Sequence, residues 1–222
     1  MKNLVCIILA RKGSKRIKNK NLLKINNKTL VEWTINFAKK ICLRKNIIFS
    51  TDSKKMRKIS IKLGINTPWL RPKEISTSKS SSFDAANHAI KWFEKNNSKI
   101  DFIVLLQPTS PFRSVSDFKR AFKKFKENTK MPLISVKKIN LTSDKFLKKT
   151  KKFIESYNKK RQETIYIPNG SFFIIKKDIL LKNRNFISEK MNFFEETDLL
   201  KNTDIDTLND YKLAKVLYSN KL

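Results

Sequence analysis

Short apolar runs alternate with amphipathic helical segments along most of this chain, and that alternation limits the folds open to it. Leu4 to Leu9 is an apolar run of strand length, and Leu30 to Leu43 repeats apolar residues at helical spacing. Asn46 to Thr51 is rich in strand-forming residues, and Lys54 to Leu63 is again helical in pattern. Strands and helices in this rhythm predict an α/β fold with a mostly parallel sheet, right-handed crossovers and flanking helices.

The second half of the chain continues the pattern, so we expect residues 1–222 to form a single domain. The further predicted strands are Asp101–Leu106, Pro132–Lys137, Ile165–Ile167, Ser171–Ile175 and Met191–Phe194. The further predicted helices are Phe83–Lys95, one capped by Ser116 or Asp117 that runs to about Lys126, and Leu208 to about Leu217. Residues 138–162 are lysine-rich with no steady hydrophobic period, which indicates an excursion from the sheet or an arm that packs on a partner.

The formal net charge of +31 raises the question of nucleic-acid binding. The lysines recur throughout the chain, however, and Lys, Asn, Ile and Phe are all abundant, as AT-rich codons would make them. We therefore regard nucleic acid as an unlikely partner and keep a basic nucleic-acid-binding protein as the non-enzyme alternative. The charge still favours a strongly anionic small ligand.

Cysteine and histidine usage excludes several kinds of site. Cys6 and Cys42 lie in apolar segments without metal-ligand spacing, which indicates buried free thiols in a reducing compartment. His88 is the sole histidine, and its place in a predicted helix favours a structural role over a catalytic one. No apolar run approaches the roughly 20 residues of a membrane span, and no cleavage site follows the first run. We therefore expect a cytoplasmic protein with no membrane partner.

A basic loop follows the first predicted strand. It contains Gly13, Ser14 and five cationic residues, Arg11, Lys12, Lys15, Arg16 and Lys18, and Lys20 lies just beyond it. Loops of this kind bind phosphates at the carboxyl edge of a parallel sheet. The alternative interpretation is a solvated basic loop in a lysine-rich chain.

Two other segments are expected to meet this loop. Gln107 to Pro111 follows a predicted strand and is held rigid by two prolines. Asp204 and Asp206 alternate on an extended segment, so both carboxylates point to one side and suit a divalent cation. Helix capping by Asp206 is the competing interpretation. Cations beside a carboxylate pair suggest nucleotidyl transfer, in which positioning and charge neutralisation supply most of the catalysis.

An ordered set of motifs carries a resemblance over nearly the whole chain. The motifs are Ala10–Ile17, Lys20-Asn21, Ser50–Asp52, Arg71–Glu74, Ser81-Ser82, Leu105–Pro111, Arg161-Gln162, Asn169-Gly170 and Asp204–Thr207. The chain resembles the acylneuraminate cytidylyltransferase family, the CMP-sialic acid synthetases and relatives that act on bacterial nonulosonic acids. This resemblance implies a Rossmann-like, mostly parallel sheet flanked by helices, of the nucleotide-diphospho-sugar transferase type. It also implies a homodimer whose small dimerisation arm lies at residues 138–162.

The resemblance further implies a reaction and a set of site residues. CTP and an acidic nine-carbon 2-keto sugar would give the CMP-sugar and pyrophosphate, with Mg²⁺ as cofactor. The implied nucleotide-binding residues are Arg11, Ser14, Lys20, Asn21, Arg71 and Ser82. The implied sugar-binding residues are Gln107, Phe173, Phe193, Phe194 and, from the neighbouring subunit, Arg161. The implied metal ligands are Asp204 and Asp206, and the implied catalytic residues are Lys20 and Asp206.

Each implied role has a structural alternative. Arg71 could pair with Glu74, and Ser82 could only cap its helix. Gln107 could serve neighbouring backbone groups, and the three phenylalanines could be core residues. For Asp52 we favour a structural role, with Asp52 or Ser53 as the cap of the following helix.

The sequence leaves the sugar open. Arg16 stands where many sialic acid enzymes have glycine, which is similar to the pseudaminic acid branch. The Gln-Pro-Thr-Ser-Pro and Phe-Phe features favour a sialic or legionaminic acid, so the two cues conflict. Transfer to the eight-carbon acid Kdo, or to another sugar, is the alternative enzyme function.

Overall fold

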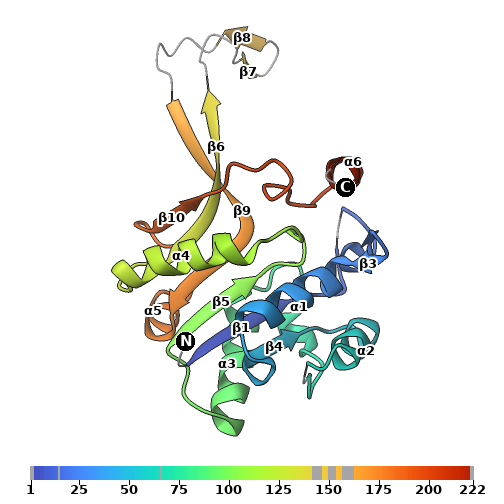
Figure 1. Cartoon of the computed structure of the whole chain (residues 1–222), viewed down its shortest axis with the longest axis vertical. Coiled ribbons are helices and arrows are strands. Elements are labelled where there is room, and N and C mark those ends of the chain that lie inside the picture. Colours follow the sequence, from blue (N-terminus) through green and yellow to red (C-terminus); the bar gives the residue numbers. More distant parts are fainter. Residues whose placement is uncertain are drawn as a thin grey trace.

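The computed structural model describes residues 3–14, 16–65, 67–141, 147–149, 154–156 and 163–220. Within these ranges a six-stranded sheet has the order β10-β6-β9-β5-β1-β4 (Figure 1). The strands are β1 (Leu4–Leu9), β4 (Ile47–Ser50), β5 (Phe102–Leu106), β6 (Leu133–Leu141), β9 (Glu163–Lys176) and β10 (Asn192–Glu195). In this sheet β9 runs antiparallel to both of its neighbours, whereas the β1–β4, β1–β5 and β6–β10 pairs are parallel. The predicted mostly parallel α/β sheet is confirmed.

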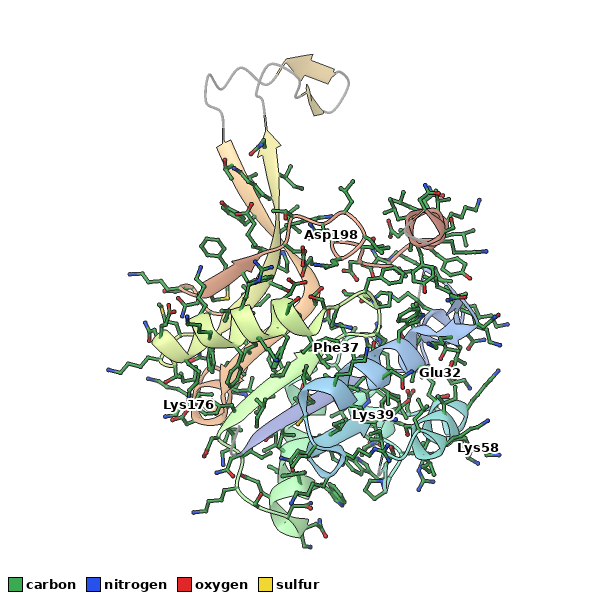
Figure 2. The ribbon with its side chains drawn as sticks, viewed as in Figure 1. Glu32, Phe37, Lys39, Lys58, Lys176 and Asp198 are labelled. Atoms are coloured by element: carbon green, nitrogen blue, oxygen red, sulfur yellow. The ribbon has the colours of Figure 1, made fainter. Side chains whose placement is uncertain are left out.

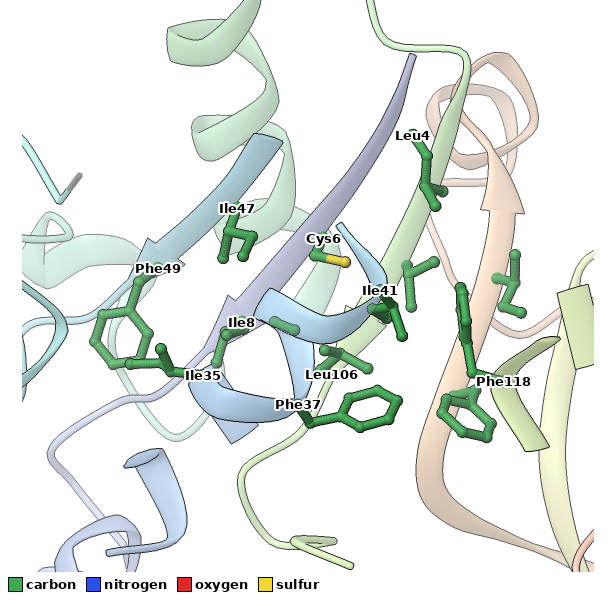
Figure 3. Close-up of a cluster of buried hydrophobic side chains, with 14 of the residues drawn as sticks. Leu4, Cys6, Ile8, Ile35, Phe37, Ile41, Ile47, Phe49, Leu106 and Phe118 are labelled. Carbon is green, nitrogen blue, oxygen red and sulfur yellow. The ribbon is translucent and has the colours of Figure 1, made fainter. Parts of the chain in front are cut away.

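Helices cover both faces of the sheet (Figure 1). They are α1 (Leu30–Ile41), α2 (Lys54–Lys62), α3 (Ser82–Asn96), α4 (Val115–Glu127), α5 (Lys177–Asn183) and α6 (Leu208–Ser219). Alternate residues of β1 point to opposite faces, so that Cys6 and Ile8 pack with α1 and α4 while Val5 and Ile7 pack with α3. Figure 3 shows the first of these cores, in which Phe37 lies close to Phe118.

Hydrogen-bonding side chains begin most of these helices. Thr29, Ser81 and Thr207 each form a capping box with an acidic residue at the third helical position. Ser53 caps α2, which confirms one of the two caps predicted for this helix, Asp52 or Ser53. Ser114 caps α4, so the prediction of Ser116 or Asp117 was wrong by two or three residues.

The carboxyl-terminal helix packs against a small hairpin near the amino terminus. The hairpin joins β2 (Lys24–Ile25) to β3 (Lys28–Thr29) through the predicted turn at Asn26 and Asn27, which both have positive φ. The Tyr211 hydroxyl donates to the Lys24 carbonyl at 2.7 Å, and the Asn26 amide donates to the Tyr218 hydroxyl at 2.9 Å. These bonds set the segment that precedes α6 beside the basic loop.

The pairing of β6 and β9 differs from the predicted strands. Two separate strands were expected around Pro168-Asn169-Gly170, but β9 is continuous through this segment because β6 pairs with it on either side of a register shift. The two strands extend beyond the sheet as a ribbon, with β7 (Leu147–Lys149) and β8 (Ile154–Ser156) further out (Figure 1). Residues 142–146, 150–153 and 157–162, which include Arg161, lie outside the described residues.

The surface is rich in lysine on several elements. Figure 2 shows Lys58 of α2 at the rim of the molecule, whereas Phe37 of α1 lies in its interior. Among the described residues, no helix has the length and apolar character needed to span a bilayer.

Candidate active site

The loops after β1 and β5 meet the segment before α6 around a cleft of about 370 Å³. The cleft is lined by Leu9, Arg11, Gly13, Ser14, Lys20, Asn21, Gln107, Pro108, Thr109, Asp204 and Asp206. β1 and β5 are parallel neighbours, so their carboxyl ends open at the same edge of the sheet. The structure therefore brings together the three segments that the sequence predicted would converge.

A second pocket of about 200 Å³ adjoins the cleft and shares Leu9, Arg11 and Gln107 with it. Its other walls are Arg71, Ile75, Thr77, Ser78, Ser80, Ser81, Ser82 and Leu105. The first pocket carries opposed cations and carboxylates, and the second is rich in hydroxyls beside Arg11 and Arg71. The combined site thus has a strongly charged part and a mainly neutral, hydrogen-bonding part.

Three hydrogen bonds hold the basic loop in place. The Lys12 backbone N–H donates to the Asp52 carboxylate at 2.6 Å, and the Asn21 amide donates to the Arg11 carbonyl at 3.1 Å. The Arg11 guanidinium donates to the Thr77 carbonyl at 2.7 Å, which ties the loop to the second pocket. Asp52 is thus structural, as predicted, but it orders the basic loop and leaves the helix cap to Ser53.

Asp206 lies against two cations of this loop. Lys20 Nζ is 2.6 Å from Asp206 Oδ1, and the Arg16 guanidinium forms an ion pair with Oδ2. Thr207 caps α6, so the capping interpretation of Asp206 was wrong. The pairing with Arg16 was not predicted, because 190 residues separate the two in the sequence.

Asp204 lies deeper in the cleft. Ile205 is fully buried and its N–H donates to the Thr109 carbonyl at 2.8 Å, so the flanking Asp204 and Asp206 both line the cleft. Burial raises the pKa of Asp204, and the negative charge of Asp206 adds to this, although a hydrogen bond from Thr109 and nearby cations oppose it.

The Oδ1 atom of Asp204 is buried and has no hydrogen-bond partner. A buried carboxylate oxygen without a partner is costly, and a divalent cation would satisfy it. Within the described part of the chain, no group of three or more His, Cys, Asp or Glu side chains could enclose a metal. The carboxylate pair therefore fits a cation whose remaining ligands come from water and from substrate oxygens.

Gly170 forms part of the wall behind these carboxylates. It has a φ of +75°, and a Cβ added there would lie 2.5 Å from Ser110 Oγ and 2.9 Å from Gln107 Oε1. Only glycine combines this backbone conformation with so close an approach. Asn169, the preceding residue, is buried and accepts a hydrogen bond from Ser135 at 2.6 Å.

Arg113 is a supporting residue that the sequence analysis missed. Its guanidinium donates to the carbonyls of Gln107 at 2.6 Å, Ser171 at 2.7 Å and Gly170 at 3.3 Å. Burial lowers its pKa to about 9, and the negative charge of Asp204 opposes that shift. Its position two residues after the end of the Gln107–Pro111 loop was the available signal.

Arg71 lies in the wall of the second pocket with its Nε and one terminal nitrogen buried and unpartnered. The described ion pairs do not join it to Glu74, so that alternative was wrong. Burial lowers its pKa, and the charge of Asp52 opposes the shift. Ser82, in the same wall, is the first residue of α3 and is not its cap, a role that belongs to Ser81.

His88 lies behind Arg71, where its Nδ1 accepts a hydrogen bond from the Trp69 indole at 2.8 Å. Burial lowers its pKa, and the charge of Arg71 adds to the effect. This placement agrees with a structural histidine.

The three phenylalanines predicted to contact the sugar do not line either pocket. Phe173 is buried in the core on the α3 side of the sheet, at an edge-to-face angle to Phe186. Phe194 is buried in the opposite core, and Phe193 is partly exposed on β10 against Tyr166 and Lys124. Successive side chains of a strand point to opposite faces of the sheet, and helices cover both faces here. Phe172 and Phe173 are therefore both buried.

The fold, together with the charged cleft and the adjoining hydroxyl-rich pocket, defines a nucleotidyltransferase. The chain belongs to the cytidylyltransferase family, whose profile matches residues 5–222.

Curated relatives of known name align over nearly all of this chain. A CMP-N,N'-diacetyllegionaminic acid synthase of Legionella pneumophila is 30% identical, over 96% of this chain and 95% of that protein. A pseudaminic acid cytidylyltransferase of Campylobacter jejuni is 28% identical, over 98% of this chain and 97% of that protein. An N-acylneuraminate cytidylyltransferase of Escherichia coli is 32% identical over 98% of this chain, which spans about half (52%) of that longer protein.

Solved structures agree on the fold. A CMP:2-keto-3-deoxy-manno-octonic acid synthetase in complex with CTP superposes with a TM-score of 0.69 at 14% identity, covering 100% of both chains. A cytidylyltransferase of Leptospira borgpetersenii superposes with a TM-score of 0.61 at 18% identity, over 99% of this chain and 88% of that one.

Proposed function

We propose that this chain transfers CMP from CTP to the anomeric hydroxyl of a nine-carbon nonulosonic acid and releases pyrophosphate. The observation that carries the proposal is the cleft at the ends of β1 and β5, where Arg11, Lys20 and two carboxylates face one another beside a nucleoside-sized pocket. Family membership supports cytidylyl transfer. The names of the relatives support the class of acceptor, since they specify legionaminic, pseudaminic and N-acylneuraminic acids.

The triphosphate is assigned to the charged part of the site. Arg11, Ser14 and Lys20 supply cationic and hydroxyl donors there, and the Asp52–Lys12 hydrogen bond holds their loop at the end of β1. Asn21, Arg71 and Ser82 are assigned to the ribose and cytosine. The unpartnered guanidinium nitrogens of Arg71 suit the carbonyl oxygen of a pyrimidine.

In the chemical step, the anomeric hydroxyl oxygen forms a bond to the α-phosphorus while the bond from that phosphorus to the bridging β-phosphate oxygen breaks. Asp206 accepts the hydroxyl proton, and pyrophosphate leaves as an anion that Arg11 and Lys20 stabilise. Asp204 and Asp206 would hold Mg²⁺, which supplies charge neutralisation for the phosphates when bound. The buried, unpartnered oxygen of Asp204 supports this assignment.

The sugar is assigned to the region of Gln107, whose side chain faces the cleft beside Gly170. Gln107 is also shared by the two pockets, which suits a residue near the junction of nucleotide and acceptor. We leave Phe173 and Phe194 out of the proposed sugar site, because both are buried in the cores.

We also propose that the enzyme is a cytoplasmic homodimer in which residues 138–162 serve as the arm and Arg161 reaches the partner's sugar site. The β6–β9 ribbon supports an arm, since it leaves the sheet and exposes Ile165, Tyr166 and Ile167 by about two-fifths of their surface (39%, 42% and 40%). Two free cysteines support a reducing compartment. Light scattering at several protein concentrations tests the dimer, and a monomer throughout would contradict it.

The function is tested by pyrophosphate release from CTP and Mg²⁺ with N-acetylneuraminic, legionaminic, pseudaminic and Kdo acids in turn. Release with a nine-carbon acid is expected and would identify the sugar. Asp206→Asn should abolish turnover while the circular dichroism spectrum is unchanged, and Asp101→Asn, far from the cleft, serves as the matched control. Release with Kdo alone would contradict the nine-carbon acceptor, and appreciable activity of Asp206→Asn would contradict the role of that carboxylate.

A further inference from the structure

Both carboxylate oxygens of Asp206 are occupied by cations of the chain itself. Oδ1 lies 2.6 Å from Lys20 Nζ, and Oδ2 pairs with the Arg16 guanidinium. The two cations differ in their surroundings, since the side chain of Lys20 is 13% exposed and that of Arg16 is 62% exposed. Lys20 is thus part of the cleft wall, whereas Arg16 reaches Asp206 from the solvent side.

Asp204, the other carboxylate of the cleft, differs from Asp206 because one of its oxygens has no partner. Its Oδ1 is buried and has no hydrogen-bond partner. A divalent cation that satisfies Asp204 and binds Asp206 as well approaches a carboxylate that Lys20 and Arg16 already contact, and Arg16 is the more exposed of these two cations. Two cations in contact with one carboxylate oxygen repel each other strongly at such distances.

We propose that Arg16 is an exchangeable counter-ion, which neutralises Asp206 in the empty site and gives way to the divalent cation on loading. This inference rests on the proposed function for the identity of the loaded site. The released guanidinium then lies beside the basic loop, where the triphosphate is assigned, and suits its phosphate oxygens. Arg16 is therefore a positioning residue that disfavours metal binding in the absence of nucleotide and favours nucleotide binding.

The exchange predicts effects of opposite sign on the two ligands. Removal of Arg16 should strengthen metal binding to the empty enzyme, because the metal no longer competes with a guanidinium. The same removal should weaken CTP binding, because a phosphate-binding cation is lost. An inert surface ion pair, the ordinary case for an exposed arginine, would change neither.

The test uses Mn²⁺ as the probe, with its free concentration followed by electron paramagnetic resonance in the absence of nucleotide. Arg16→Gly should bind Mn²⁺ up to about fivefold more tightly than the unaltered chain, given the usual range for an exposed ion pair. Arg16→Lys, which keeps the positive charge, should have a Mn²⁺ affinity between those of Arg16→Gly and the unaltered chain. Lys18→Gly is the matched control, because Lys18 is an exposed cation of the same loop and joins no ion pair among the described residues. Its Mn²⁺ affinity should change less than twofold at about 0.15 M salt, where distant surface charges are screened.

A second measurement follows CTP binding calorimetrically with Mg²⁺ and without an acceptor sugar, because Arg16 is released only when the metal is bound. Under these conditions Arg16→Gly should bind CTP several-fold more weakly than Lys18→Gly. Equal Mn²⁺ affinities of Arg16→Gly and Lys18→Gly would overturn the exchange, as would the absence of Mn²⁺ binding to all variants. The Mn²⁺ measurement needs no turnover. If no sugar acid supports pyrophosphate release but Arg16→Gly gains Mn²⁺ affinity, the proposed function fails while the exchange at Asp206 stands.

Discussion

The guanidinium of Arg113 donates a hydrogen bond to the main-chain carbonyl of Gln107 at 2.6 Å. The same group reaches the carbonyls of Gly170 and Ser171, so one side chain joins the end of β5 to the bend in β9. Gln107 and Gly170 both lie beside Asp204, which places Arg113 directly behind the wall of the cleft.

Arg113→Lys should lower both stability and activity, because an ammonium group cannot reproduce a planar fork that binds three carbonyls. We expect a loss of about 1–3 kcal/mol in the free energy of unfolding, with a raised KM for the acceptor sugar through displacement of Gln107. Urea unfolding and steady-state kinetics measure the two effects. Arg120→Lys is the control, since Arg120 is an exposed residue of α4 that pairs with Asp117. Equal stability of the two variants would contradict the role given to Arg113.

Gly170→Ala should destabilise the chain and impair catalysis, whereas Gly13→Ala should leave stability almost unchanged. At Gly170 a Cβ would meet Ser110 and Gln107, and the φ of +75° disfavours any L side chain. At Gly13 nothing lies within 4 Å of the added carbon. We expect a cost of about 1–3 kcal/mol at Gly170, measured by denaturant unfolding. Comparable melting temperatures for the two variants would show that the crowding at Gly170 is relieved by small shifts.

Arg71→Met should weaken CTP binding about ten- to a hundredfold, the usual range for hydrogen bonds to a charged group, without loss of stability. The buried guanidinium nitrogens have no partner in the empty pocket, so their removal relieves a cost to the folded state. Calorimetric titration with CTP and thermal unfolding provide the two readouts. Arg57→Met is the complementary control, because Arg57 donates to the Thr67 carbonyl at 2.7 Å outside the two pockets. That variant should lose stability and keep its CTP affinity; the reverse pattern would refute the assignment.

Asp117 should make stability depend on pH in the acid range. Burial opposes its ionisation, but hydrogen bonds from Lys201, Ser114 and Arg120 outweigh burial and lower its pKa from 3.8 to about 2. The unfolded chain therefore binds more protons around and between these values, so the stabilisation is complete only above about pH 5 and is lost progressively as the pH falls through 2. The amount at neutral pH is about 2 kcal/mol at most.

Urea unfolding between pH 6 and pH 2.5 measures this dependence for the unaltered chain and for Asp117→Asn. The asparagine variant should be less stable at pH 6, and the difference should shrink as the pH falls. Asp178→Asn is the matched control, because the Asp178 pair with Lys176 is exposed. A constant difference between the unaltered chain and Asp117→Asn across this range would exclude the proposed titration.

The sequence predicted the order and type of most elements, because their signals are local. Periods of two and 3.6 residues identified β1 and α1, and an Asn-Asn pair located the turn between β2 and β3. Prediction was poorer at element ends and at β9, since a neighbouring strand decides where pairing continues. The cap of α4 at Ser114 illustrates the same limit.

For the candidate site, the sequence by itself determined which segments line the cleft: a basic loop after β1, Gln107–Pro111 after β5, and Asp204 with Asp206 before α6. Strand direction and residue spacing are enough for that, because carboxyl ends of parallel strands meet at one edge. Only the tertiary structure decided which side chains pair: Arg16 and Lys20 with Asp206, Arg113 with the Gln107 carbonyl, and Phe173 with the core. These contacts join residues distant in sequence, and they depend on how the sheet and its covering helices pack, which no local pattern encodes.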